Sequence, residues 1–408
     1  MNNKRLYKFG ENMKRFRNML PGLVIFLLVI ILALYSFAPH APKTPARVED
    51  AAELESYLNR LVDSGNPPGL SLVVAKDGNI VYNNAFGVAD GPGGIKTDTD
   101  TVYHWWSMTK IPTAIAIMQL REQGQLNLDD GVTEYLPWFE VTYPSDTSQV
   151  ITIRDLLQHT SGLPDTVPAI IGWVHYDDAT RDQTGIVKKY LPDYRKLKFE
   201  PRQKAIYSNL NYMVLGAIIE SVSGQSYETY ITENILEPLG MSQTGFVYTP
   251  SMAKKEAFGT LPLVHLYTPL LPGLLDTSAL IHKRQGKLLW LNRVYIDATP
   301  STGLIGPSTD IAHFMIAYLN HGSLDGNLLL QPESVSLLTG TPPIDGHGLG
   351  WSVGESNNAL YLEHAGGGPG FATIMRLYPE KGMGFAILAN GTDLDREGLM
   401  DMLAKMEW

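Results

Sequence analysis

Residues 102–124 read VYHWWSMTKIPTAIAIMQLREQG. The first five residues form an apolar string, and the apolar side chains that follow recur at helical spacing: Ile111, Ile115, Met118 and Leu120. Gly124 can end such a helix because glycine readily adopts the left-handed conformation. The segment therefore predicts a buried helix, and Ser107 and Lys110 share one face of its first turn.

β-rich segments flank this helix on both sides in the sequence. Upstream, residues 70–75 and 79–89 are joined by the turn Lys76-Asp77-Gly78. Downstream, residues 349–353, 359–366, 372–379 and 383–390 are also strand-like, whereas residues from about 126 to 300 indicate helices and long connections. Helices are expected over residues 48–62 and 396–405. These patterns predict an α+β fold, in which an antiparallel sheet from both ends of the chain is flanked by the N- and C-terminal helices and carries an inserted, mostly helical lobe.

The composition narrows the class of protein. The chain has 408 residues, of which 44% are hydrophobic and 18% charged, so global disorder is excluded. Its net charge of −10 argues against a nucleic-acid partner. The absence of cysteine excludes disulfides, thiolate metal sites and a cysteine nucleophile. The ten histidines show no metal-ligand spacing, so neither a metal site nor a cofactor is predicted.

The N-terminus has the pattern of a membrane anchor. Residues 1–18 carry six basic side chains against the single acid Glu11, and residues 20–38 contain no charge. Nineteen helical residues span about 28 Å, close to the thickness of the bilayer core. The basic flank predicts a cytoplasmic N-terminus and a catalytic domain in the periplasm or at the cell surface. A signal peptide cleaved after Ala38 remains an alternative, although Pro39 disfavours the cut.

These features divide the chain into a cytoplasmic tail (1–18), a transmembrane anchor (19–38), a linker (39–47) and an exported body (48–408). The linker is expected to be extended because three prolines fall within residues 39–45. Within the body we expect a sheet lobe from residues of about 48–106 and 300–408, and a helical lobe of about 107–299.

Ser107-Met108-Thr109-Lys110 is the first candidate for chemistry. A lysine one turn after a serine can take the proton of its hydroxyl, and the helix N-terminus favours an unprotonated amine and an oxyanion. The spacing alone is not specific, since Ser251-Met252-Ala253-Lys254 matches it without a preceding strand. An exposed polar turn is the alternative interpretation of either match.

Two further groups stand at the ends of expected elements. Tyr207-Ser208-Asn209 precedes a helix, so its tyrosine could relay a proton and its amide could orient a lysine and a substrate carbonyl. His364-Ala365-Gly366-Gly367 ends a strand, where glycines allow a close approach of backbone and ligand. Each group alone also fits a structural role, and Tyr-x-Asn recurs at residues 57–59, 82–84 and 318–320. Only the joint occurrence favours an active site.

Longer segments around these groups resemble one family. They include ITIRDLLQHTSGLP, YSNLNYMVLGAIIESVSGQSYETYI, ILEPLGM, GLIGPSTDIAHFM, HGLGW and HAGGGPGF. From about residue 48 onward the chain resembles the serine beta-lactamase and penicillin-binding protein superfamily, nearest to class C beta-lactamases and related DD-peptidases, D-aminopeptidases and esterases. The resemblance implies a serine hydrolase that cleaves an amide or ester and whose substrate is a small molecule or peptide. With the anchor expected from the N-terminal pattern, this would be a membrane-anchored enzyme.

The resemblance also implies roles for individual residues. Ser107 would be the acylated nucleophile, Lys110 its general base, and Tyr207 the proton relay that also activates water. Asn209 would hold the substrate amide, and the backbone N–H groups of Ser107 and Gly367 would form the oxyanion hole. His364 and Gly366 belong to the third motif and would line the substrate site. His159, in the HTSGLP segment, is expected to be structural.

The third motif departs from the Lys-Thr-Gly usual in beta-lactamases, because His364 stands where they have lysine. This puts efficient beta-lactam hydrolysis in doubt. A histidine with an ordinary pKa near 6.5 would be mostly neutral at pH 7 to 8, and we expect it to gain charge as the pH falls. Preference for anionic substrates would then strengthen at lower pH.

Two insertions, residues 165–204 and 249–298, depart from a compact family member. For the second we expect a cap over the helical lobe, with contact to substrate or bilayer as the alternative. A different functional class also remains open: a catalytically inactive relative that serves as a binder or assembly protein on the membrane.

Overall fold

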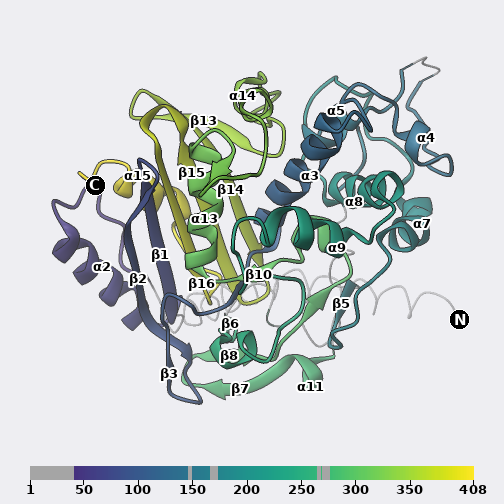
Figure 1. The fold of residues 1–408 in the computed structure, drawn as a ribbon. Helices are drawn as coiled ribbons and strands as arrows, with labels where there is room; N and C mark the ends of the chain where they lie inside the picture. The colour runs from purple at the N-terminus through teal and green to yellow at the C-terminus, as the bar shows by residue number, and fades with distance from the viewer. Residues whose placement is uncertain (1–40, 146–148, 166–172, 264–267, 269–275) are drawn as a thin grey trace, which may run out of the picture.

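The computed structural model describes residues 41–145, 149–165, 173–263, 268 and 276–408. Its largest element is a seven-stranded antiparallel sheet in the order β13-β14-β15-β16-β1-β2-β3 (Figure 1). The strands are β1 (Gly69–Lys76), β2 (Asn79–Asp90), β3 (Ile95–Lys96), β13 (Ser352–Ser356), β14 (Ala359–Gly368), β15 (Phe371–Tyr378) and β16 (Met383–Ala389). Because β1 pairs with β16, the prediction of one sheet built from both ends of the chain is confirmed.

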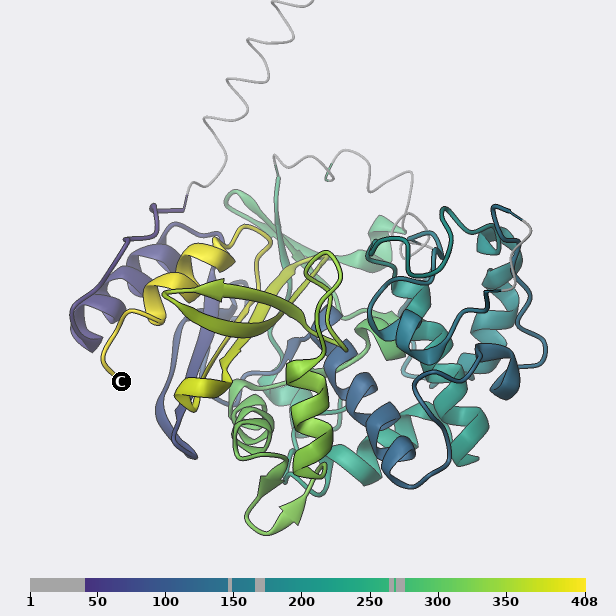
Figure 2. The ribbon, with the colours of Figure 1, turned by 90° about the horizontal axis from the view of Figure 1, so that it is seen from above.

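Both faces of this sheet are covered. Along β1, Leu72 and Val74 pack in one core with the helices α2 (Ala51–Asp63) and α15 (Arg396–Leu403). Val73 and Ala75 belong to the other core, which includes α13 (Ser308–Leu319) and the helical lobe. Figure 2 shows α2 and α15 on one side of the sheet and α13 on the other. Burial on both faces explains why the strand reads as a nearly continuous apolar run.

The first helix has a clear start signal. Asp50 accepts a hydrogen bond of 2.9 Å from the backbone N–H of Glu53, and the Glu53 carboxylate accepts one of 2.8 Å from the N–H of Glu49. The first bond satisfies an N–H group that the helix itself leaves unpaired, and the second ties Glu49, just before the N-cap Asp50, to the first turn. The helix therefore begins at Ala51, three residues after the start predicted from apolar spacing.

The helical lobe packs around α3 and α8. Pro164 and Leu157 precede α8 in the chain and lie beside its first turns, as their carbonyl contacts with Ser208 and Tyr212 show. The helices of the lobe are α3 (Lys110–Glu122), α4 (Val132–Tyr135), α5 (Ile153–Leu157), α7 (Gln183–Tyr194), α8 (Asn209–Ser223), α9 (Tyr227–Ile231), continued by the π-helical turn η3 (Thr232–Leu236), and α12 (Thr299–Thr302).

The described part of the second insertion forms a small sheet, β6-β8-β7 (Thr260–Pro262, Leu288–Leu291, Ile281–Gln285). The N–H of Phe258 donates to the carbonyl of Ala89, and the N–H of Thr260 donates to that of Gly370. The small sheet packs at one end of the large sheet because these backbone groups find their partners there (Figure 1). Another part of the insertion, β9 (Tyr295–Ile296), pairs with β5 (Val174–His175) of the first insertion. Most of the apolar stretch for which the cap is expected lies outside the described residues, so the cap over the helical lobe stays a prediction.

The remaining elements are short. Three strand pairs join β4 (Tyr103–His104) to β10 (Ile305–Gly306), β5 (Val174–His175) to β9 (Tyr295–Ile296), and β11 (Ser323–Leu324) to β12 (Asn327–Leu328). The others are η1 (Trp106–Thr109), η4 (Met252–Lys255), α11 (Thr277–Leu280), α14 (Pro332–Gly340) and η6 (Pro379–Lys381).

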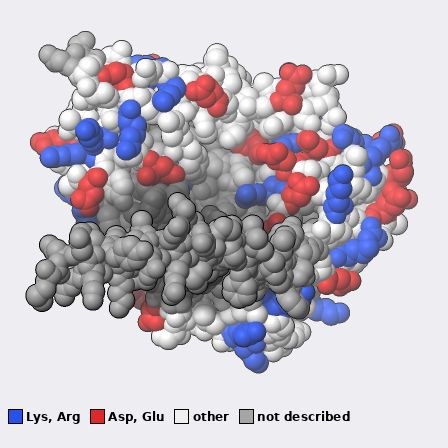
Figure 3. Space-filling view, turned by 180° about the vertical axis from the view of Figure 1, so that it is seen from behind, with Lys and Arg blue, Asp and Glu red and all other residues white. Residues whose placement is uncertain are grey.

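Within the described residues, no helix is long and apolar enough to cross a membrane. The predicted tail and anchor, residues 1–38, lie outside the described residues, so both stay predictions. On the face of the body seen in Figure 3, basic and acidic side chains of the described residues are interspersed.

Candidate active site

Ser107 lies on the 3₁₀ turn η1, directly before α3. The sequence placed it in the first turn of the α-helix. In a 3₁₀ turn residues i and i+3 eclipse each other, which brings Lys110 over Ser107 with 3.2 Å between Nζ and Oγ. Trp106 has a φ of +50°, a left-handed conformation that is strained for a bulky residue. The hydroxyl of Thr109 donates to the Trp106 carbonyl at 2.7 Å and so holds this turn.

Lys110 is completely buried. Its Nζ lies 2.8 Å from Oδ1 of Asn209 and 2.9 Å from the carbonyl oxygen of Ser301. Burial holds the pKa of Lys110 well below its usual range, and the charge of Asp165 opposes this only in part. A neutral amine can donate its two N–H groups to these two oxygens and keep its lone pair for the Ser107 hydroxyl. The arrangement can therefore deprotonate Ser107.

Tyr207 completes the contacts of the serine. Its hydroxyl donates to Ser107 Oγ at 2.8 Å, and its ring lies 4.9 Å from the Nζ of Lys110. Burial raises the pKa of Tyr207 well above its usual value, and the bond to Ser107 offsets only part of this. The phenol is thus neutral at physiological pH, so it can pass a proton on but does not start as a phenolate base.

His159 supports the segment that carries Tyr207. Its Nδ1 accepts hydrogen bonds from the backbone N–H of Ser208 at 3.2 Å and from the amide of Asn211 at 3.0 Å. Its ring centroid lies 4.6 Å from that of Tyr207. Burial holds the pKa of His159 well below its usual range, so the ring is a neutral acceptor. These contacts agree with the structural role expected for it.

Asn209 is the first residue of α8 and lies inside the site. While its oxygen faces Lys110, its Nδ2 donates to Asp165 at 3.3 Å. The structure thus brings Ser107, Lys110, Tyr207 and Asn209 together. Asn209 is buried and orients the lysine here, whereas contact with a substrate amide stays a prediction.

His364 lies in β14, with its ring centroid 6.4 Å from that of Tyr207. Nδ1 of His364 lies 2.9 Å from the carbonyl oxygen of Ala365. Because a carbonyl oxygen can only accept a hydrogen bond, the hydrogen of the neutral ring is on Nδ1, and Nε2 is left as an acceptor. Burial, aided by the charge of Lys110, lowers the pKa of His364 to about 3. The expected titration near pH 6.5 is therefore wrong, because burial removes the water that would stabilise a charged imidazole.

Gly366 brings β14 close to Trp105, just before the turn η1 that carries Ser107. A side chain at Gly366 would overlap the carbonyl oxygen of Trp105 and the hydroxyl of Thr373. Only glycine fits this approach, as the sequence indicated. The role of the Gly367 N–H in an oxyanion hole stays a prediction.

Three residues that sequence reasoning missed also adjoin the site. Ser301 contributes a backbone carbonyl, which no side-chain motif reveals. His347 lies with its ring centroid 5.1 Å from that of His159, and its only sequence signal was the HGLGW segment. Arg396, at the start of the last helix, donates to the carbonyl of Gly366 at 2.8 Å and places a cation beside the third motif.

The competing sequence matches lie elsewhere. Ser251 is exposed and its hydroxyl contacts that of Thr249, while Lys254 is exposed on η4. Of the other Tyr-x-Asn groups, Tyr82 and Asn84 both bond to Glu55 of α2. Among the described residues, no group of three acidic, histidine or cysteine side chains is placed to hold a metal ion.

Comparisons with known proteins agree with this geometry. A family model described as Beta-lactamase matches residues 54–405. Protein flp of Staphylococcus aureus (strain N315) is 28% identical over 339 residues, which cover 83% of this chain but 62% of that protein, less than two thirds of its length. A putative D-alanyl-D-alanine carboxypeptidase of Escherichia coli (strain K12) is 29% identical over 76% of this chain and 74% of its own.

Solved structures share the fold. The octameric penicillin-binding protein homologue from Pyrococcus abyssi is similar with a TM-score of 0.69 and 26% identity, over 87% of this chain and 77% of that one. D-amino acid amidase from Ochrobactrum anthropi SV3, complexed with D-phenylalanine, gives a TM-score of 0.65 at 20% identity, over 85% and 96% of the two chains. At that identity the second likeness concerns the fold alone.

Proposed function

Because this chain belongs to the Beta-lactamase family, we propose that it is a membrane-anchored serine hydrolase that cleaves an amide or ester through an acyl-enzyme on Ser107. One observation carries the proposal. The Oγ of Ser107 lies between the Nζ of Lys110, at 3.2 Å, and the hydroxyl of Tyr207, at 2.8 Å. A nucleophile in reach of a base and a proton relay is the arrangement that acyl transfer requires.

The reaction follows from these contacts. Lys110 takes the Ser107 proton while Oγ attacks the substrate carbonyl carbon, and the N–H groups of Ser107 and Gly367 stabilise the oxyanion. The proton then passes from Lys110 through Tyr207 to the leaving nitrogen or oxygen as the carbonyl bond to it breaks. In the second half of the reaction, water attacks the carbonyl carbon of the acyl-enzyme, and the bond of that carbon to Ser107 Oγ breaks. A proton of the water passes through Tyr207 and Lys110 to Ser107, and the acid product is released.

The substrate is a small molecule or peptide, and we keep three classes: a D-amino peptide, a carboxylic ester or a beta-lactam. The similarity to a putative D-alanyl-D-alanine carboxypeptidase supports the first class. The neutral His364, where beta-lactamases carry a lysine, argues against efficient beta-lactam hydrolysis. The basic tail and the uncharged run over residues 20–38 support anchoring, with the body outside the cytoplasmic membrane.

Covalent labelling tests the proposal. The full chain in detergent is treated with a fluorescent fluorophosphonate, and the labelled peptide is identified by mass spectrometry. Label should appear on Ser107 and disappear in Ser107→Ala. Ser251→Ala is the matched control, since it removes the other Ser-x-x-Lys serine and should label normally. Folded wild type without label would favour the inactive binder instead.

A further inference from the structure

The Ser301 carbonyl that faces Lys110 belongs to α12, a helix of four residues. This short helix cannot hold its own position, so its neighbours must fix it. The Pro300 carbonyl accepts from Thr113 Oγ1 at 2.7 Å, and the Leu304 N–H after the helix donates to Thr109 Oγ1 at 3.1 Å. Thr109 is the last residue of η1, the turn that carries Ser107, and Thr113 lies in the first turn of α3. These bonds fix the middle and the end of α12 but not its first residue.

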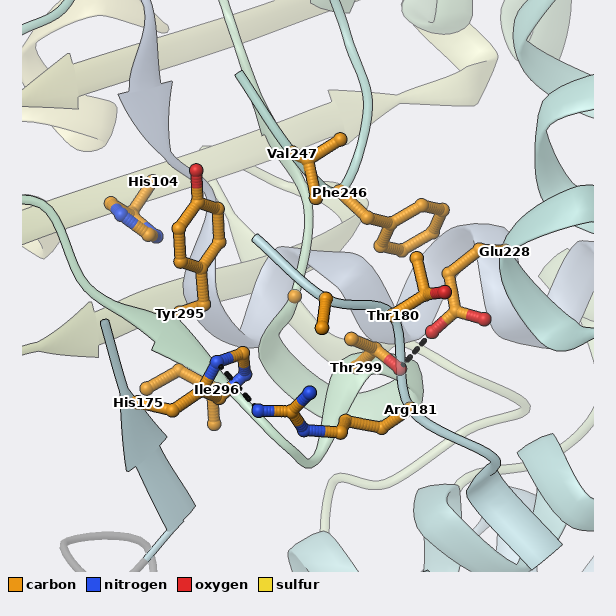
Figure 4. A pocket seen from close by; sticks show the side chains of 12 residues that line it. His104, His175, Thr180, Arg181, Glu228, Phe246, Val247, Tyr295, Ile296 and Thr299 are labelled. Carbon is orange, nitrogen blue, oxygen red and sulfur yellow. Dashed lines mark hydrogen bonds between the residues drawn. The ribbon is translucent and has the colours of Figure 1, made fainter. Parts of the chain in front are cut away.

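Glu228 on α9 holds that first residue. The Thr299 hydroxyl donates to Glu228 Oε1 at 2.7 Å, the bond drawn in Figure 4. Glu228 is only 6% exposed, so water does not compete strongly for this bond. The chain of contacts from Glu228 to Lys110 thus runs through Thr299 and two further residues of α12.

Among the described residues, no cation is paired with Glu228. Arg181 lines the same pocket, and Figure 4 shows its guanidinium turned toward His175. The guanidinium also bonds to Asp297 and Asp177. Within the described part of the chain, Oε2 of Glu228 is buried without a hydrogen-bond partner. Burial raises the pKa of its carboxyl. A carboxyl in such a place costs folding free energy that an apolar side chain would not, so stability alone does not explain it.

Glu228 also contacts the first insertion. Nε2 of Gln183, the first residue of α7, lies 3.4 Å from Oε1 of Glu228. Gln183 is completely buried. The carboxyl oxygen that receives the Thr299 hydroxyl therefore also joins α7 to α9 and α12.

We propose that Glu228 is a positioning residue for the reaction: through Thr299 it fixes α12, so that the Ser301 carbonyl aims the Nζ lone pair of Lys110 at Ser107. The inference rests on the proposed function. Glu228 itself touches neither Ser107 nor Lys110 in the described contacts, so its effect is on the rate of acylation and not on the binding of a substrate.

The test measures fluorophosphonate labelling of the full chain at several probe concentrations. In Glu228→Ala the limiting rate of labelling at high probe concentration should fall about tenfold, a loss of the size expected when a catalytic group is displaced. The probe concentration that gives half of the limiting rate should not change. Glu228→Gln should stay near wild type because its amide oxygen still accepts the Thr299 hydroxyl. Thr299→Val should slow labelling as much as Glu228→Ala does, because it removes the hydroxyl of the same bond, whereas Thr299→Ser keeps a hydroxyl and should be near wild type. The double variant Glu228→Ala/Thr299→Val should be no slower than either single variant, because both changes break one contact.

Glu233→Ala is the matched control. Glu233 is a carboxylate of the turn η3 that continues α9, but it is exposed and accepts from Nε2 of Gln225 at 2.7 Å. Its loss should leave the labelling rate of folded protein near wild type. Equal loss of rate in Glu233→Ala, or wild-type rates in both Glu228→Ala and Thr299→Val, would overturn the proposal. Wild type that does not label at all would overturn the proposed function and this inference with it.

Discussion

Oδ1 of Asn209 lies 2.8 Å from Nζ of Lys110, although 99 positions separate the two residues in the sequence. The contact joins the start of α8 to the start of α3. An amide oxygen orients the amine without adding a negative charge next to it. Burial can therefore keep the pKa of Lys110 low, which is the state a general base needs.

Asn209→Asp should raise the pKa of Lys110, because a carboxylate in contact with the amine favours the charged form. More of the lysine is then protonated at neutral pH. We expect labelling at pH 7 to slow about tenfold or more, and the acidic limb of the rate profile to move to higher pH by about one unit.

Asn209→Ala is the comparison for this shift. It removes the acceptor without adding a charge, so its acidic limb should not move to higher pH even where the rate falls. The measurement is the labelling rate from pH 5 to 10 for the three proteins. An aspartate variant with an unshifted limb would show that Lys110 is not the titrating base.

Tyr207→Phe and Tyr212→Phe form a matched pair. Both rings lie close to Lys110, at 4.9 and 5.6 Å, but only the Tyr207 hydroxyl reaches Ser107. The Tyr212 hydroxyl donates to the carbonyl of Leu157 instead. Loss of a proton relay should lower kcat about 100-fold in Tyr207→Phe, and Tyr212→Phe should stay within about threefold of wild type. The measurement is kcat on an ester that the wild type turns over. Equal losses of kcat in the two variants would contradict a proton relay through the Tyr207 hydroxyl.

His364 should not change its charge between pH 5.5 and 8.5. Its pKa of about 3 means that protonation begins only well below this range, because the folded state disfavours the charged form. The ratio of kcat/KM for an acidic substrate to that for its neutral methyl ester should therefore stay flat with pH. Taking the ratio on one enzyme cancels the ionisations of Lys110 and Tyr207, which act on both substrates.

His364→Gln provides the comparison for this ratio, since it replaces the imidazole by a neutral polar group. Its ratio should be as flat as that of the wild type. A ratio that rises toward pH 5.5 in the wild type and not in the glutamine variant would show that His364 gains a charge and attracts the carboxylate.

The proposed N-terminal anchor implies a topology for the chain that can be tested. Protease added outside spheroplasts should digest the body and spare a tag placed before residue 19, because the basic tail favours the cytoplasmic side. After permeabilisation with detergent the tag should be lost as well. A body protected from protease in intact spheroplasts would contradict the predicted orientation.

Sequence pattern alone sufficed for the large sheet and for the proximity of Ser107 and Lys110. Strands such as β1 and β16 are recognised from continuous apolar runs between turns, and their pairing follows from the few ways in which such runs can share one sheet. The contact of Ser107 with Lys110 is also local, since three residues of helical backbone place the two side chains together whether the turn is 3₁₀ or α.

What only the tertiary structure decided depends on distant parts of the chain. The Ser301 carbonyl reaches Lys110 from 191 positions away, and a backbone oxygen has no signature in the sequence. The low pKa of His364 arises from desolvation by all of its neighbours, which no local pattern reports. The second insertion likewise packs against the end of the large sheet because its backbone groups find partners at Ala89 and Gly370. Local spacing determines which groups can act, whereas burial and long-range hydrogen bonds determine their charge, their orientation and their partners.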